Sequence, residues 1–214
     1  MRLFKRAPAM HAVLAVVAIA SQIALELVPE AGAALSRILA PLVACGMLYA
    51  AAAVDAGERV RVRHAWRAFG ASAGAIAAIV VSSAATFTVE WFVARALGGV
   101  DLLRPAEASS ALPGEVVIAI YAAGIAASLP MTFVPLESLF AGRGFAGSFA
   151  ASARLFAAHA GALAVYGAIA LALIAVGLMT MGVGLVVALP LVSCATWAAW
   201  RDLAAASSAT PRDA

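Results

Sequence analysis

Six ionisable side chains lie in or beside long apolar runs of the sequence, and they are the residues with which this chain could do chemistry. They are Glu90, Glu137, Arg154, His159, Arg201 and Asp202. A charge inside lipid is costly, so such a residue is a candidate for ion binding, for proton transfer or for an ion pair. The sequence around each of them narrows these roles.

Glu90 precedes Trp91, a residue type that favours the membrane interface, so Glu90 is expected just inside the outer headgroups. Arg95 follows five residues later, a spacing that is poor for a pair on one helix. A partner on another helix is therefore equally expected. Glu90 is predicted to be either a site for a proton or a transported ion, or half of an ion pair.

Glu137 lies near the inner end of an apolar run, and Arg201 or Arg154 could neutralise it. An ion pair that holds helices together is the favoured interpretation. Arg201 and Asp202 are adjacent in sequence, so we expect that they do not face each other and that each pairs with another part of the chain. His159 begins a later apolar run and has no metal-ligand set around it.

Catalytic and metal-binding motifs are absent from the sequence. The chain has three His and two Cys, without HExxH, CxxC or GxSxG. Cys45 and Cys194 lie within apolar runs, where a thiol behaves as a small apolar side chain. His11 and Glu26 are expected to reach the two interfaces. We therefore predict no cofactor, no metal and no enzymatic activity.

The composition is that of a membrane protein. Of the 214 residues, 65% are hydrophobic and 12% are charged, whereas soluble domains average about 45–50% and about 25%. The mean hydropathy is +1.02. Continuous apolar runs without alternation indicate helices and not the strands of a barrel. The net charge of +3 does not indicate nucleic-acid binding, because the basic residues lie at the ends of the apolar runs.

Six runs approach the roughly 20 residues that cross a bilayer, so the predicted fold class is an all-α polytopic membrane helix bundle. The runs extend from about Ala9 to Val28, Leu35 to Val54, Gly70 to Ala96, Glu115 to Phe140, Gly161 to Thr180 and Val183 to Trp200. Prolines at 41, 130, 135 and 190 are expected to kink or break their helices. A turn is predicted at Met181 to Gly184, and a disordered cytoplasmic tail over residues 204–214.

Two stretches between these runs are predicted to be short amphipathic helices in the membrane interface. In Arg59 to Phe69, apolar residues recur at helical spacing among basic ones, and this basic face would contact anionic lipid headgroups. An ordinary basic loop that sets topology explains this stretch equally well. The second stretch is Arg143 to Phe156. The expected interfacial anchors are Arg63, Trp66, Arg67, Phe69, Trp197 and Trp200.

The basic residues predict the orientation of the chain. With six spans, eleven of the fourteen Lys and Arg residues fall on the side of the N-terminus. The positive-inside rule then places both termini in the cytoplasm of a bacterium, with the chain in its inner membrane.

An internal repeat divides the single membrane domain, residues 1–203, into three parallel helical hairpins. They cover about residues 2–55, 64–141 and 153–202. Arg2–Phe4 matches Arg154–Phe156, and Pro41–Cys45 matches Pro190–Cys194. The middle hairpin matches less closely and contains the longest polar loop.

The runs Pro41–Phe69 and Pro130–Asp202 carry a resemblance to a known family. The second run ends in Thr-Trp-Ala-Ala-Trp-Arg-Asp over Thr196–Asp202. It resembles a family of small six-span bacterial inner-membrane proteins with a domain of unknown function, which typically ends in aromatic, small, small, aromatic, Arg, Asp. That family usually has Tyr at both Trp positions and Asn where this chain has His159. The resemblance implies fold and location, and it implies no chemistry.

Two functions remain open on the sequence alone. The first is a non-catalytic structural, assembly or membrane-property factor, with a membrane protein or a second copy of the chain as partner in the lipid bilayer. The alternative is a small transporter or lipid-handling protein with a central cavity near the proline-kinked helices. A central cavity lined by Glu90 or Glu137 would favour the alternative, and a filled centre would exclude it.

Overall fold

The computed structural model describes residues 2–28, 32–103 and 112–209, and these residues form helices and turns without any strand. The elements are α1 (Arg2–Arg6), α2 (Pro8–Glu26), α3 (Gly32–Asp55), the 3₁₀ helix η1 (Val62–Gly70), α4 (Ala73–Gly98), α5 (Gly114–Ser128), the 3₁₀ helix η3 (Leu129–Met131), α6 (Val134–Leu139), α7 (Phe145–Met179) and α8 (Leu185–Ala209). The predicted all-α class is confirmed.

Four helical stretches among the described residues are long and apolar enough to cross a membrane. They are α2, α4, the stretch Gly114–Leu139 that joins α5 to α6, and α7. The chain is therefore built as a membrane protein. The predicted second and sixth spans are also helical, as α3 and α8, and each contains a proline, Pro41 and Pro190.

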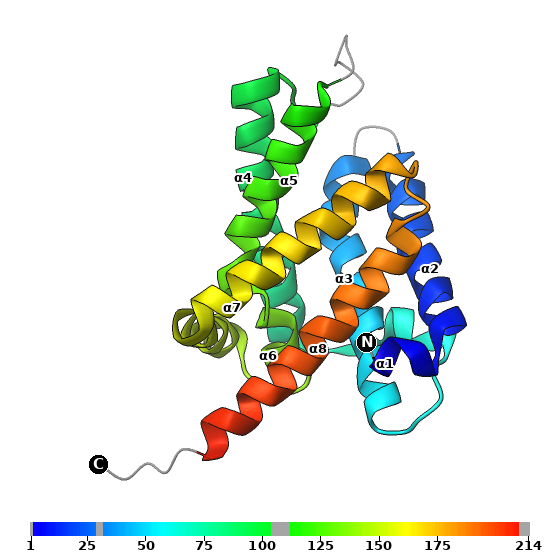
Figure 1. Cartoon of the computed structure of the whole chain (residues 1–214), viewed down its shortest axis with the longest axis vertical. Coiled ribbons are helices and arrows are strands. Elements are labelled where there is room, and N and C mark those ends of the chain that lie inside the picture. The colour runs from blue at the N-terminus through cyan, green and yellow to red at the C-terminus, as the bar shows by residue number, and fades with distance from the viewer. Residues whose placement is uncertain (1, 29–31, 104–111, 210–214) are drawn as a thin grey trace.

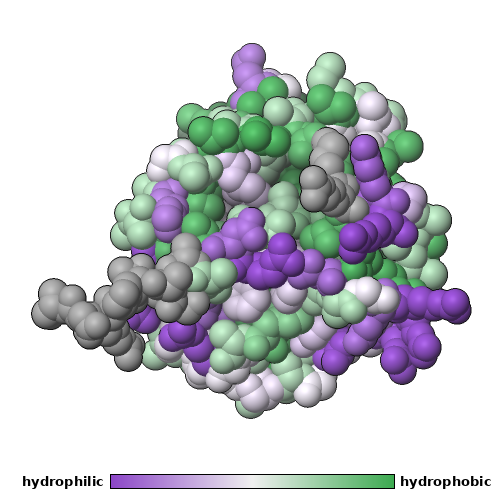
Figure 2. Space-filling view, turned by 60° about the horizontal axis from the view of Figure 1, so that its bottom comes forward, coloured by the Kyte–Doolittle hydropathy of each residue, from purple (hydrophilic) through white to green (hydrophobic). Residues whose placement is uncertain are grey.

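The helices are arranged as neighbouring pairs (Figure 1). α2 lies beside α3 on one side of the molecule, and α4 lies beside α5 on the other. α7 and α8 cross the front of the view, inclined to the other pairs, and meet at a turn at its upper right. η1, α6 and the end of α3, which Arg201 of α8 contacts, lie at the opposite end, which we call the η1 end. Figure 2 brings this end forward and shows patches of hydrophilic residues between hydrophobic ones.

The turn between α7 and α8 lies where the sequence predicts it. Met181 and Gly182 take positive φ values of 54° and 84°. The hydroxyl of Thr180 accepts the backbone N–H of Gly184 at 2.8 Å. Gly177 lets α8 approach closely, since a Cβ there would lie 2.5 Å from a methyl carbon of Leu185. These contacts fix the angle at which the two helices leave the turn.

The predicted fourth span is broken at its prolines. α5 ends at Ser128, three residues of 3₁₀ helix follow, and α6 begins with Pro135 in its first turn. Ser152 of α7 satisfies two backbone groups that the break leaves without helical partners. Its hydroxyl donates to the carbonyl oxygen of Pro130 at 2.8 Å and accepts the N–H of Phe133 at 3.1 Å. The break is thus fastened to α7.

α7 combines two segments that the sequence separates. The predicted amphipathic stretch and the fifth span form one helix with a bend at His159, whose φ and ψ are −132° and 30°. In Figure 1 the part before the bend is seen nearly end-on, and the part after it runs diagonally. The sequence predicts an irregular tail from Ala204. α8 instead continues to Ala209, because alanine favours helix. Residues 210–214 lie outside the described residues.

η1 is a short helix of the 3₁₀ type that packs on α3 through one face and leaves part of the predicted apolar stripe exposed. His64, Ala65 and Ala68 are buried, whereas Trp66 and Phe69 of the predicted apolar stripe are exposed. The cause is a close approach to α3. A Cβ on Gly46 would lie 2.5 Å from the Cα of Ala65, so only glycine lets η1 lie directly on α3.

The main hydrophobic core brings matched parts of the sequence repeat together. Cys45 and Cys194 are both buried in it, and Phe4 and Phe156 both pack against it. Both cysteines are free thiols. A second cluster, between α2, α3 and η1, contains Leu14, among other residues.

Candidate functional site

Glu137 is held in a structural ion pair at the η1 end. Its side chain is buried, and its Oε2 lies 2.6 Å from Nε of Arg143. This is an ionic contact without hydrogen-bond geometry, because Oε2 has no hydrogen-bond partner among the described residues. Oε1 accepts the indole N–H of Trp200 at 2.9 Å. The predicted ion pair is present, but Arg154 and Arg201 were the wrong partners.

Arg201 pairs with Asp55 at the end of α3, which is a separate part of the chain as predicted. The indole N–H of Trp197 donates to Oδ2 of the same carboxylate at 3.2 Å. Contrary to expectation, Arg201 also lies 3.7 Å from Oδ1 of Asp202. These contacts tie the ends of α3 and α8 together.

The two tryptophans expected as interfacial anchors turn inward. Trp197 is buried and its ring centroid lies 4.9 Å from that of Phe140, which in turn lies 4.9 Å from Tyr49. Trp200 lies 5.4 Å from Trp197. Both indole N–H groups are used by buried or half-buried carboxylates, and these bonds hold the two rings against the helix ends.

Among the η1 residues, Trp66 and Phe69 are exposed, as a membrane anchor requires. The guanidinium of Arg67 lies 5.0 Å over the ring of Tyr49. Arg63 is exposed on the same short helix.

Glu90 lies in the contact between α4 and α5. A Cβ on Gly124 of α5 would lie 2.2 Å from Oε1 of Glu90. The carboxylate of Glu90 therefore occupies the space where any other residue at position 124 would place its Cβ. Arg95 lies instead 3.7 Å from Asp101 and 5.6 Å from the ring of Trp91.

Arg154 and His11 have contacts that the sequence did not predict. The exposed Arg154 donates from Nε to the carbonyl oxygen of Ala150 at 3.2 Å. His11 does not reach the interface, since it is fully buried. Its Nδ1 lies 2.8 Å from the oxygen of Ala7, and its Nε2 lies 3.5 Å from the sulfur of Cys194.

A cavity of about 360 Å³ lies in the middle of the bundle, and we call it the central cavity. Its walls come from α3, α4, α5, η3, α6, α7 and α8, and include Pro41 and Pro135. Neither Glu90 nor Glu137 lines it, and no residue that lines it is charged. Its polar wall consists of hydroxyl groups: Ser82, Ser83, Thr86, Ser128, Thr132, Tyr166, Ser193 and Thr196.

The protons of most of these hydroxyls are already used by the protein. Five of them donate to backbone carbonyl oxygens of their own helix or helix end: Ser82 to Ile79, Thr86 to Ser82, Ser128 to Ile125, Thr132 to Ser128 and Thr196 to Val192, at 2.8–3.2 Å. Since Thr196 has a single hydroxyl proton, Tyr166 must be the donor in the 2.7 Å bond between them. The six oxygens therefore face the cavity as acceptors.

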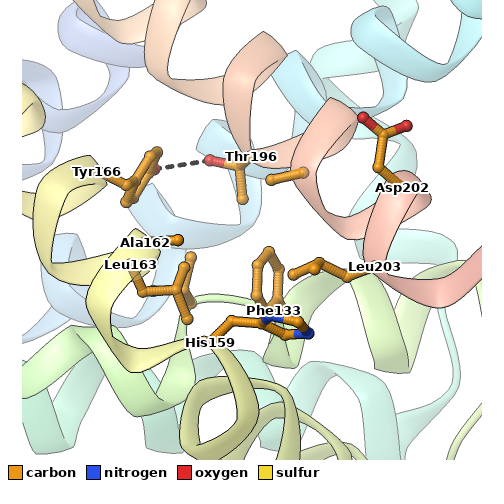
Figure 3. A pocket seen from close by; sticks show the side chains of 10 residues that line it. Phe133, His159, Ala162, Leu163, Tyr166, Thr196, Asp202 and Leu203 are labelled. Atoms are coloured by element: carbon orange, nitrogen blue, oxygen red, sulfur yellow. Dashed lines mark hydrogen bonds between the residues drawn. The ribbon is translucent and has the colours of Figure 1, made fainter. Parts of the chain in front are cut away.

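A second cavity of about 170 Å³ lies between α7 and α8, over Phe133, and we call it the interhelical cavity. Figure 3 shows Tyr166 and Thr196 joined by their hydrogen bond on one side of it and His159 on the other. Asp202 and Leu203 also line it. The structure thus brings two predicted candidates, His159 and Asp202, to one cavity. Glu90, Glu137 and Arg201 lie in contacts between helices, and Arg154 is exposed on α7.

A third cavity, of about 400 Å³, opens at the η1 end. Arg6 and Arg59 line it beside Glu58, so it carries both signs of charge. Within the part of the chain that the structure describes, no group of three or more His, Cys, Asp or Glu side chains could hold a metal ion.

No family model, no curated protein and no solved structure matches this chain. The resemblance to a six-span inner-membrane family therefore stays a prediction. The roles of the residues above follow from their geometry alone.

The hydroxyls of the central cavity are functional candidates that the sequence reasoning missed. A signal for them exists in the spacing of polar residues within apolar runs. Ser82 and Thr86 are four residues apart, and so are Ser128 and Thr132. Residues four apart lie on one face of a helix, so each pair marks a polar stripe that faces the bundle interior.

Proposed function

We propose that this chain is an integral membrane protein of the bacterial inner membrane that binds an uncharged small molecule or lipid in its central cavity. It would act as a small transporter or lipid-handling protein. The central cavity carries this proposal, because it lies at the proline breaks and its volume of about 360 Å³ falls in the range of ligand pockets, roughly 300–1,000 Å³. A filled centre would have excluded it.

The absence of charge on the cavity wall selects the ligand class. Glu137 is neutralised by Arg143, and Asp55 by Arg201, both at the η1 end. Glu90 rests on Gly124 between α4 and α5. None of these groups lines the central cavity, so an ionised ligand would be buried there without a counter-charge, at a high cost. An uncharged ligand avoids this cost.

The proposal includes six membrane spans. α3 and α8 contain 24 and 25 residues, which at about 1.5 Å per residue exceed a hydrocarbon core of about 30 Å. α3 would form a hairpin with α2, α8 would form one with α7, and α4 with α5 and α6 would form the third. The η1 end, with its exposed Arg59, Arg61 and Arg63, would be cytoplasmic and would contact anionic headgroups.

This orientation can be measured with single cysteines placed on a background without Cys45 and Cys194. A membrane-impermeant maleimide applied from the outer side should label a cysteine at Gly182 and not one at Glu58. The reverse pattern would contradict the orientation. Labelling of both from the outer side would contradict the six-span arrangement.

A non-catalytic structural or assembly factor is the second candidate. The observation that favours it is the network at the η1 end, where two ion pairs and the cluster Tyr49, Phe140, Trp197 and Trp200 join α3, α6 and α8. Such a network needs no ligand. In either case we propose that the chain is not an enzyme.

The two candidates differ in whether a molecule occupies the central cavity. Ala170 of α7 is buried and lines this cavity, whereas Ala168 is exposed on the same helix. The protein should be purified from its native membrane in mild detergent, and bound molecules extracted and counted by mass spectrometry. We expect one uncharged molecule per chain in the wild type and in Ala168→Leu, and its loss in Ala170→Leu. Equal retention by all three proteins would contradict the proposed site.

A further inference from the structure

The central and interhelical cavities are neighbours that share one wall. Thr132, Tyr166 and Thr196 line both of them. Figure 3 shows the bond from the Tyr166 hydroxyl to Thr196 at the edge of the interhelical cavity. This bond crosses from α7 to α8 at the boundary between the two spaces. A single ligand that occupied both cavities would pass beside the side chain of Tyr166.

The wall of the central cavity favours a ligand group that carries hydrogen-bond donors. Six of its eight hydroxyl groups give their own protons to carbonyl oxygens or to Thr196, so these six offer acceptor oxygens, while the hydroxyls of Ser83 and Ser193 can also donate. A polar group is buried without penalty only where its hydrogen bonds are made. A ligand group in this cavity meets more acceptors than donors, so a head that brings donors, such as an alcohol or a glycerol-type head, fits it best.

The interhelical cavity favours an apolar part of the ligand. Away from the shared wall, its lining is mostly hydrocarbon and aromatic: Phe133, Ala162, Leu163, Ala199 and Leu203. An apolar cavity of similar size stays dry and takes apolar molecules. Asp202 stands at its edge with an exposed carboxylate, which repels an anionic group there. A hydrocarbon chain meets both conditions.

We infer that the ligand is a neutral amphiphile whose hydroxyl-bearing head lies in the central cavity and whose single hydrocarbon chain passes through the interhelical cavity, which holds only the first part of the chain. Tyr166 stands at the junction of head and chain and must shift, or bond the head, for the ligand to occupy both spaces. This inference rests on the proposed function and adds the substrate class to it. It distinguishes the ligand from fatty acids and from phospholipids, whose heads are charged.

The test uses 1-monooleoylglycerol as probe and methyl oleate as its matched control, which has the same chain and no donor. Ala162 lines the interhelical cavity and is exposed, so Ala162→Leu should fold and shorten the space for the chain. Ala164→Leu places the same side chain on an exposed position of α7 that lines neither cavity. Thermal unfolding of each variant in detergent checks that its fold is intact.

The dissociation constant of each probe should be measured for each of these proteins and for Ala170→Leu. Ala170 is buried and lines the central cavity, so Ala170→Leu should displace a head bound there. We expect Ala162→Leu and Ala170→Leu each to weaken the binding of 1-monooleoylglycerol at least tenfold. Ala164→Leu should bind as the wild type does.

Three results would overturn the inference. One is methyl oleate binding as tightly as 1-monooleoylglycerol, because the acceptor oxygens of the cavity wall would then not distinguish a ligand with hydrogen-bond donors from one without them. The second is unchanged affinity in Ala162→Leu, because the chain would then lie elsewhere. The third is unchanged probe affinity in Ala170→Leu, because the head would then lie outside the central cavity. In each case, loss of the native molecule in Ala170→Leu would leave the proposed function standing, whereas its retention there would overturn both.

Discussion

Tyr166 of α7 donates its phenolic proton to Thr196 of α8 across 2.7 Å, and Thr196 donates its own proton to the carbonyl oxygen of Val192. The relay joins the two helices at the wall between two cavities. It also leaves both hydroxyl oxygens as acceptors. A hydrogen bond between two helices can thus set the ligand chemistry of a cavity and hold its boundary.

The Tyr166–Thr196 bond should be measurable as a coupling energy. In the cycle Tyr166→Phe, Thr196→Val and both together, we predict a coupling of about 0.6 kcal/mol and not above about 1.7 kcal/mol, the range of interhelical hydrogen bonds in membrane proteins. Reversible unfolding in mixed micelles gives the free energies. Thr88→Val is the control, since Thr88 donates to Ala84 on an exposed face. Additive effects of Tyr166→Phe and Thr196→Val would contradict the assignment.

Ser152 should be the most sensitive serine of α7. Ser152→Ala leaves the carbonyl of Pro130 and the N–H of Phe133 without their partner, and both lie at the break between α5 and α6. We predict a loss of about 1–3 kcal/mol in the free energy of unfolding. Thr88→Ala should cost well under about 1 kcal/mol by the same measurement. If the two variants lose the same stability, Ser152 does not support the break.

Gly46 should tolerate no side chain. Gly46→Ala places a methyl group against the backbone of Ala65, so η1 must move away from α3. Overpacking of this kind costs about 1–3 kcal/mol, which a lowered unfolding temperature would show. Gly70, at the end of η1, has open space at the same position. Gly70→Ala should therefore unfold at the wild-type temperature, and a comparable loss there would refute the role of the close contact.

His64 should make stability depend on pH. Burial, and then the positive charges of Arg67 and Arg63, lower the pKa of His64 below its usual value. Below about pH 6.5 the unfolded chain binds a proton that the folded chain does not. Stability should therefore be constant above that pH and fall as the pH falls, until the pKa of the folded state is reached. His64→Gln should remove this loss in unfolding experiments between about pH 7.5 and 5, and an unchanged pH profile would exclude His64 as its source.

Local patterns in the sequence predicted the helices and their breaks well. Pro130 and Pro135 were expected to interrupt one helix, and they do so because proline removes a backbone donor and clashes with the preceding turn. The turn at Met181–Gly184 followed from its glycines. Such features depend on residues close together in the chain, so composition and spacing suffice.

Side-chain partners were predicted less well than the helices. Glu137 was expected to pair with Arg154 or Arg201, yet its partner is Arg143, just beyond the end of α6. Trp197 is of a residue type that favours the membrane interface, but its contacts with Phe140 and Asp55 hold it in the core. Which helices meet at the η1 end depends on their tilt and on close contacts such as that of η1 with α3. Periodicity within one helix does not contain that information.

The central cavity was expected from the prolines, but its wall was not. Charges in lipid stand out in a sequence, so Glu90 and Glu137 are the residues expected to line a cavity. Ser82 and Ser128 were overlooked, since a hydroxyl that bonds its own helix costs little in an apolar run. Only the packing of α4, α5, α7 and α8 shows that these hydroxyls meet in one space.

The central claim is that the central cavity holds one uncharged molecule. Native mass spectrometry of the intact protein, released directly from its membrane, tests this most directly. The account predicts a single added mass per chain in the wild type, of a molecule without net charge, and the bare chain mass in Ala170→Leu. A wild-type protein that shows only the bare chain mass, or an added mass that survives Ala170→Leu, would contradict it.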